Sequence, residues 1–357
     1  LISRQQVCWK ARLWDENENC GDWSEEAFFE MGLLSHSDWQ ANWIAGDYSV
    51  RKKQRYPVEC FRKTFSAERV AKARLYITAC SLYEARLNGR RIGDFVLAPG
   101  STDYRRRIQY QTYDVTELLQ SGENDLTAEL ADGWYRGSSG AKGRTNTYGT
   151  QSKLLAQLEL THTDGRMETV CTDESWRWSN DGPIRFADLK DGEVVDARFA
   201  PSYSGKARRI KYTANLTASD NVPVMERERF SPVERITTPS GKTVLKFPQN
   251  LSGYLSFRLT AHGGQKVHIT LGEMLGDDGE LTLKNIQCVH HGKRTPLQEL
   301  DYTCKEGRNE YTPKFFDGGF QYAQVDTDTP FEAEDFTAVA VYSAFEEAGD
   351  FECSHPL

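Results

Sequence analysis

Residues 73–79 read ARLYITA, and every second residue of this stretch is apolar. Because successive side chains of a strand point to opposite faces, the spacing places the apolar side chains on one face. The alternation returns over residues 83–87, and Asn88-Gly89 follows directly. An Asn-Gly pair tolerates a positive φ at both central positions, which favours a tight hairpin. This region therefore predicts paired antiparallel strands.

The same short alternation, broken by Gly, Asn, Asp and Pro, continues along most of the chain. Such a pattern is typical of antiparallel β architecture. Helical pattern is scarce, with one helical turn expected at 116–119, before Gly122. The predicted fold class is all-β, with two antiparallel, jelly-roll-like β-sandwich domains. Further strands are expected at 108–114, 125–131, 154–161, 208–213, 254–260, 266–272 and 337–343.

The length of 357 residues suits two or three domains, since single domains usually have about 100–200 residues. The first residues already alternate like a strand in progress, so we expect a trimmed N-terminus. We expect the closing strands of a small sandwich at 1–35, a linker at 36–57, a first β domain at 58–218, a polar linker at 219–231, a second β domain at 232–345, and the lead-in to a further domain at 346–357.

Composition limits the partners. The formal net charge of −8 argues against nucleic acid or an anionic membrane surface, because neither attracts an acidic protein. The basic run at 105–107 is expected at a solvated strand edge. No apolar run approaches the roughly 20 residues that span a bilayer. The eight scattered cysteines form no CxxC pair, and no HExxH motif occurs, so a zinc site is not expected. We expect a buried free thiol at Cys80, mostly reduced cysteines and a cytoplasmic protein; the alternative is secretion, with the signal peptide removed or outside this sequence.

No residue pattern nominates a catalytic centre. Glycosidases need two carboxylates across the scissile bond, but Asp277-Asp278 precedes Gly279 as in a hairpin turn. Glu299 and Asp301 are expected on one solvent face of a strand. GxSxG, P-loop and dinucleotide-binding motifs are absent from the sequence.

The glycine-rich segment 131–149 suits sugar recognition, because aromatic faces stack on pyranose rings while Asp, Asn and Arg bind hydroxyls. Its candidate ligands are Asp132, Trp134, Tyr135 and Asn146. Oxygen ligands in such loops also suit Ca²⁺. The alternative is that Trp134 and Tyr135 close the edge of the sandwich core, and both interpretations remain open.

Two further polar segments, 179–183 and 188–193, are candidates to lie beside this loop, although plain turns explain them as well. The first of them adds Asn180 to the candidate sugar ligands. Asp132 and Asn180 are the candidate Ca²⁺ ligands.

Several motifs, in order, resemble the N-terminal β domains of bacterial α-L-rhamnosidases (glycoside hydrolase family 78). Residues 7–34 resemble the end of the fibronectin-like domain that often precedes them. The motifs are LNGRRIGD (87–94), APGSTDY (98–104), RIQYQTYDVT (107–116), DGWYRG (132–137), DGEVVDAR (191–198), QNLSG (249–253), EYTPKFF (310–316), GFQY (319–322) and GDFECS (349–354).

The resemblance implies hydrolysis of terminal α-L-rhamnose with inversion, by two Glu residues of an (α/α)₆ barrel that would follow Leu357. No catalytic residue is therefore assigned here, and the chain by itself is expected to be inactive. In some relatives the domain equivalent to 58–218 binds L-rhamnose through Ca²⁺, and an Asp-Asn pair is the favourable form. This chain has Asp132-Gly133 there, Ser101 where a Trp is usual, and Pro248 where an Asp is usual.

The resemblance implies two partners, L-rhamnose-containing glycans and the parent protein's own C-terminal catalytic domain. Two functions follow: a carbohydrate-binding module, or structural scaffold domains that pack on the catalytic barrel. An exposed Trp134 beside free Asp132 oxygens favours the first, and a buried Trp134 with Asp132 capping a turn favours the second.

Overall fold

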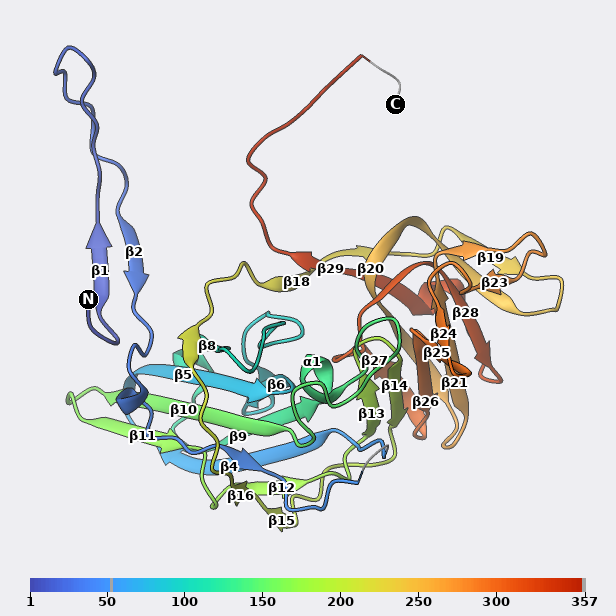
Figure 1. Cartoon of the computed structure of the whole chain (residues 1–357), viewed down its shortest axis with the longest axis horizontal. Coiled ribbons are helices and arrows are strands. Elements are labelled where there is room, and N and C mark those ends of the chain that lie inside the picture. The colour runs from blue at the N-terminus through green and yellow to red at the C-terminus, as the bar shows by residue number, and fades with distance from the viewer. Residues whose placement is uncertain (52–53, 355–357) are drawn as a thin grey trace.

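The computed structural model describes residues 1–51 and 54–354, and these residues form an almost entirely β protein, as predicted (Figure 1). Helices are limited to single turns: η1 (His36–Asp38), η2 (Thr116–Leu118), α1 (Gly133–Arg136) and η3 (Ala333–Asp335). None of the described helices has the length and apolar character needed to cross a bilayer.

The first β domain is a sandwich of two sheets around one core, in which Phe61, Leu75 and Leu126 are almost fully buried. One sheet contains β3 (Ile44–Ala45), β5 (Val70–Cys80), β8 (Ile108–Asp114), β10 (Lys153–His162), β11 (Met167–Cys171), β16 (Arg208–Arg209) and β17 (Leu216–Ala218). The other contains β4 (Glu59–Ala67), β6 (Leu82–Leu87), β7 (Arg90–Arg91), β9 (Gly122–Ala131), β12 (Arg177–Ser179) and β15 (Gly205–Lys206).

The hairpin predicted at Asn88-Gly89 is confirmed. Asn88 has φ 53° and Gly89 has φ 77°, and the turn joins β6 to β7. The predicted helical turn is present as η2, and Cys80 is a buried free thiol, as expected. The strand predicted at 208–213 forms only over the two residues of β16.

The second β domain is a single, strongly bent ten-stranded sheet. Its long strand β20 (Thr243–Ala261) pairs first with β28 (Gly318–Thr327), then with β29 (Phe336–Ser343) and finally with β27 (Gly307–Tyr311). The sheet wraps an aromatic core that includes Phe247, Phe257 and Phe320. Its other strands are β13 (Ile184–Asp188), β14 (Gly192–Asp196), β18 (Val224–Phe230), β19 (Glu234–Thr237), β21 (Lys266–Gly272) and β26 (Glu299–Thr303). Two small hairpins, β22 (Met274–Leu275) with β23 (Leu281–Thr282) and β24 (Cys288–His290) with β25 (Lys293–Thr295), extend from it.

The first segment contributes two strands to the second sheet, which differs from the sequential division predicted. Strands β13 and β14 lie within the segment 58–218 but join the second sheet, where β14 pairs in parallel with β26. Gly192 permits this pairing: it has φ 108°, and a Cβ there would lie 1.7 Å from the Glu299 carbonyl oxygen. The expected linkers also carry strands, because β3 lies within 36–57 and β18 lies within 219–231.

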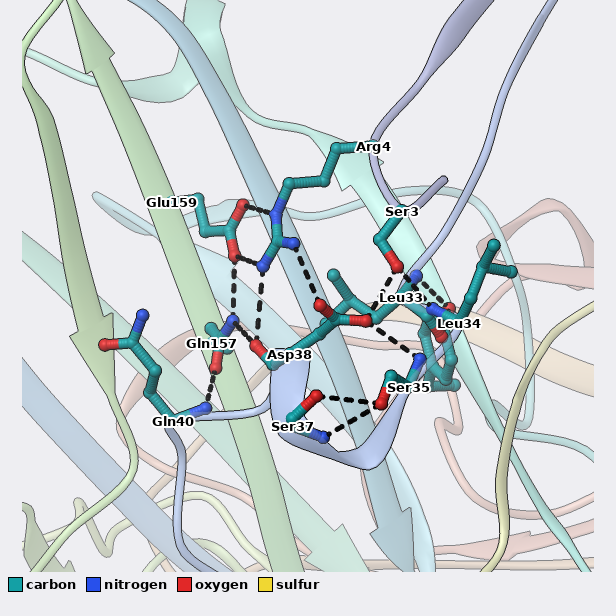
Figure 2. A network of polar contacts seen from close by, with 11 residues as sticks. Ser3, Arg4, Leu33, Leu34, Ser35, Ser37, Asp38, Gln40, Gln157 and Glu159 are labelled. Atoms are coloured by element: carbon teal, nitrogen blue, oxygen red, sulfur yellow. Dashed lines mark hydrogen bonds and ion pairs between the residues drawn. The ribbon is translucent and has the colours of Figure 1, made fainter. Parts of the chain in front are cut away.

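Strands β1 (Gln6–Trp9) and β2 (Ala27–Glu30) form a hairpin that projects from the first sandwich (Figure 1). Figure 2 shows the polar network that fastens its base. Arg4 forms a forked pair with Glu159 of β10, at 2.7 and 2.5 Å, and a third nitrogen lies 3.5 Å from the Asp38 carboxylate. Gln157 donates to both Glu159 and the Asp38 carbonyl. The hairpin is therefore held by side-chain contacts and not by backbone pairing with the sheets of the sandwich.

Candidate functional site

A polar cavity of about 410 Å³ lies where the two β domains meet. The segment before β4, the loop after β9, strand β13 with the turn after it, and the β24–β25 hairpin each contribute to its walls. Its lining residues are Val50, Arg51, Gln54, Arg55, Tyr56, Asp132, Arg136, Ser138, Gly143, Thr145, Asn146, Thr150, Phe186, Asp188, Asp191 and Lys293.

The floor of the cavity is organised by Arg136, whose side chain is 4% exposed. Helix α1 has only one turn, and it places Arg136 four residues after Asp132, so that Nε lies 2.6 Å from Oδ1. Arg136 also donates to the Tyr48 hydroxyl at 2.9 Å and lies 3.9 Å from the buried Glu59 carboxylate. Burial raises the pKa of Asp132 to about 6, although the Arg136 charge opposes this shift.

A second wall is formed by Asp188, which is 3% exposed. Its Oδ2 accepts from the backbone N–H of Ser138 at 2.6 Å, and its Oδ1 accepts from the backbone N–H groups of Lys190 and Asp191. The Ser138 hydroxyl is buried and has no hydrogen-bond partner within the described residues. Because a buried hydroxyl normally has a partner, this one is an unsatisfied polar group beside the cavity.

The rim of the cavity is basic. The Arg55 guanidinium lies 4.1 Å from the centre of the Phe186 ring and 3.5 Å from Oδ2 of Asp191. The Asp191 carboxylate, which is 2% exposed, also accepts from the Thr295 hydroxyl at 3.0 Å. Across the cavity, Lys293 donates to the Gly143 carbonyl at 3.2 Å. The hairpin of the second domain therefore closes the site against the glycine-rich loop of the first.

Of the predicted sugar ligands, the structure brings Asp132 and Asn146 together in this cavity. Tyr135 is 3% exposed, and its hydroxyl accepts from Lys153, which matches the alternative of a core-closing residue. Trp134 is half-buried between two hydrophobic cores, so neither of the two environments considered for it holds in full. Asn180 lies in the turn between β12 and β13 and is not among the lining residues.

The polar run 188–193 does lie beside the loop, through the hydrogen bond that the Ser138 N–H donates to the Asp188 carboxylate. Sequence reasoning did not single out Arg55, Arg136, Ser138 or Lys293. For Arg136 a signal existed, since a basic residue four positions after Asp132 can pair with it on a helical turn. Ser138 lies in the same glycine-rich segment as Asp132, whereas Arg55 and Lys293 come from separate segments that no local pattern joins to it.

The side chains in place do not fit a Ca²⁺ ion, which takes six to eight oxygen ligands. Asp132 is already paired with Arg136, Gly133 supplies no side chain, and Asn180 lies outside the cavity lining. No group of three or more His, Cys, Asp or Glu side chains suited to a metal occurs among the described residues. Calcium dependence stays a prediction for titration.

The fold and the cavity define a class: tandem β domains, of which the first contributes two strands to the sheet of the second, with a polar cavity of small-molecule size where they meet. Family models match in series the "Rha78A-like, N-terminal immunoglobulin domain" (residues 1–35), the "Alpha-L-rhamnosidase N-terminal domain" (68–236) and the "Bacterial alpha-L-rhamnosidase concanavalin-like domain" (236–342). The chain belongs to the bacterial α-L-rhamnosidase family and comprises its N-terminal β domains.

Individual relatives agree. An "Alpha-L-rhamnosidase" of Formosa agariphila is 33% identical over 99% of this chain and 40% of its own length. An "Alpha-L-rhamnosidase" of Streptomyces avermitilis is 35% identical over 89% of this chain and 31% of its own length. The crystal structure of an α-L-rhamnosidase from Aspergillus terreus has a TM-score of 0.91 at 34% identity, covering 100% of this chain and 42% of the other. The chain thus spans less than half the length of these relatives.

Proposed function

We propose that this chain is the non-catalytic N-terminal part of an α-L-rhamnosidase, and that its interdomain cavity binds a terminal L-rhamnosyl residue of a glycan. The relatives named above support the parent activity. The observation that carries the binding role is a cavity whose lining brings Asp132 and Asn146 together with the Phe186 ring. A volume of about 410 Å³ also falls within the range of small-molecule sites.

The cavity offers the chemistry that a deoxy sugar requires. Carboxylates of Asp132 and Asp188 accept from sugar hydroxyls, and the guanidinium of Arg136 donates. The ring of Phe186 is an apolar surface for the methyl group and C–H face of the sugar. These groups are held in place by their own hydrogen bonds, so binding orders few side chains.

A calorimetric titration with L-rhamnose, once in Ca²⁺ and once in a chelator, tests this role. We expect saturable heat in both buffers, because the described side chains form no Ca²⁺ cage. Asn146→Gly, which suits the positive φ of this position, removes an exposed lining side chain and should weaken binding about fivefold through the loss of one hydrogen bond. Asn180→Gly, at a turn outside the cavity lining, is the matched control.

Heat seen only with Ca²⁺ would instead support the metal-dependent mode predicted from the sequence. Absence of heat in both buffers would contradict the binding role and leave the scaffold function. The half-buried Lys314, which bridges from the second domain to Glu84 and Glu129 of the first, supports that second candidate. An aryl rhamnoside assay should show no turnover by this chain alone.

A further inference from the structure

Among the charged residues that line the cavity, the acidic residues lie deeper than the exposed basic residues. The acidic ones, Asp132, Asp188 and Asp191, are buried or half-buried. Each already has partners: Arg136 for Asp132, three backbone N–H groups for Asp188, and the Thr295 hydroxyl with Arg55 for Asp191. Their negative charge is therefore compensated inside the protein.

The exposed charged lining residues, in contrast, are all basic: Arg51, Arg55 and Lys293. Arg51 has no ion pair within residues 1–51 and 54–354, and Lys293 donates only to the Gly143 carbonyl there. Arg55 has one carboxylate contact at 3.5 Å, and its side chain is 54% exposed. Three cationic groups with spare N–H donors thus surround the mouth of a cavity in a protein of net charge −8.

The position of Arg55 is also fixed. Its guanidinium stacks 4.1 Å from the centre of the Phe186 ring while its edge faces Asp191. A stacked and paired guanidinium loses less freedom on binding a ligand than an unsupported side chain, and its planar donors suit a two-oxygen anion. A guanidinium binds an anion more strongly than a neutral hydroxyl, because the hydrogen bonds to an anion are assisted by charge, so the rim favours a ligand with negative charge.

We propose that the glycan carries an anionic group, a uronate carboxylate or a sulfate ester, on the sugar next to the bound rhamnose, and that Arg51, Arg55 and Lys293 bind this group. The inference rests on the proposed function, because the rhamnosyl residue occupies the floor. It extends the proposed function to a substrate class, the acidic rhamnosyl glycans, because neutral rhamnosides lack the anionic group that the rim recognises.

Four ligands test this inference by calorimetry: L-rhamnose, rhamnosyl-glucose, rhamnosyl-glucuronic acid, and rhamnosyl-glucose with a sulfate on the glucose. We expect at least one acidic disaccharide to bind about tenfold more tightly than the neutral one, as for one charge-assisted contact. The preference should decrease with added salt, because the contacts are exposed and screened. Comparison of the two acidic ligands identifies the carboxylate or the sulfate as the preferred anion.

The variants Arg51→Gln, Arg55→Gln and Lys293→Gln should each reduce the acidic preference, measured as the ratio of the affinities for the acidic and the neutral disaccharide. Arg258→Gln, at an exposed position that pairs with Glu310, is the matched control and should leave the preference intact. All these positions are exposed, and the thermal midpoint of each variant checks that folding is preserved.

Equal affinity for neutral and acidic disaccharides, with rhamnose still bound, would overturn the anionic specificity and leave the proposed function standing. Absence of binding to all four ligands would overturn both. An acidic preference that survives all three rim variants would show that the anion binds elsewhere.

Discussion

The two junctions of this molecule differ in construction. The hairpin β1–β2 rests on the first sandwich through side-chain pairs, chiefly Arg4 with Glu159 and Arg74 with Glu30. The two β domains are instead joined through backbone, since β14 of the first segment pairs with β26 of the second over five residues, and buried charges complete the contact. We infer that the two β domains unfold as one cooperative unit, whereas the hairpin detaches at lower free energy.

The largest expected effect concerns Glu193 of β14, which is 2% exposed. Its carboxylate accepts from the Tyr311 hydroxyl at 2.5 Å and from the backbone N–H groups of Lys314 and Phe315. Glu193→Ala leaves these donors unsatisfied in the interface and should lower the free energy of unfolding by about 3–5 kcal/mol.

Chemical denaturation measures this loss. Glu310→Ala, on the exposed face of β27, is the control and should change the free energy by no more than about 0.5 kcal/mol. A single transition that moves as a whole is expected for Glu193→Ala. Separate transitions for the two β domains would contradict the cooperative unit.

A smaller effect, which depends on pH, comes from Asp317 at the same junction, where its N–H donates to the Leu189 carbonyl. Burial raises the pKa of Asp317 to about 6, and the hydrogen bond from Ser252 opposes this only in part. Between pH 4 and 6 the folded state therefore holds a proton that the unfolded state has released. The Asp317 contribution to the free energy of unfolding thus decreases as pH rises through this window.

Asp317→Asn should leave stability unchanged at pH 3.5 and raise it by about 1–2 kcal/mol at pH 7. Denaturation curves at a series of pH values measure the difference. For Asp277→Asn, at an exposed turn, the difference in the free energy of unfolding from the original protein should not change with pH. A raised stability that is equal at both pH values would mean that the charge of Asp317 is not its cause.

The sequence predicted the strands better than the junctions. Residues 108–114 and 266–272 form the predicted strands β8 and β21, because a period of two and a buried face are local properties. The parallel pairing of β14 with β26 joins residues about a hundred positions apart, and no local pattern records it. For the same reason, the sequence predicted only some of the residues that line the cavity. Asp132 and Asn146 lie in one glycine-rich segment, whereas Arg55 and Lys293 reach the site through the arrangement of the domains.

The smallest expected effect is at the hairpin junction. Arg4→Ala removes the forked pair with Glu159, but Gln157 still donates to that carboxylate. The change should weaken docking of the hairpin by about 1 kcal/mol, while the unfolding transition of the two β domains stays within about 0.5 kcal/mol of its original value.

Hydrogen exchange of the β1–β2 amides should become faster, with no change at β5 or β10. Lys10→Ala, whose pair with Glu26 spans 4.0 Å at an exposed site, should leave exchange unaltered. If Arg4→Ala accelerated exchange in the sandwich core as much as in the hairpin, the two junctions would be energetically alike and the contrast between them would be lost.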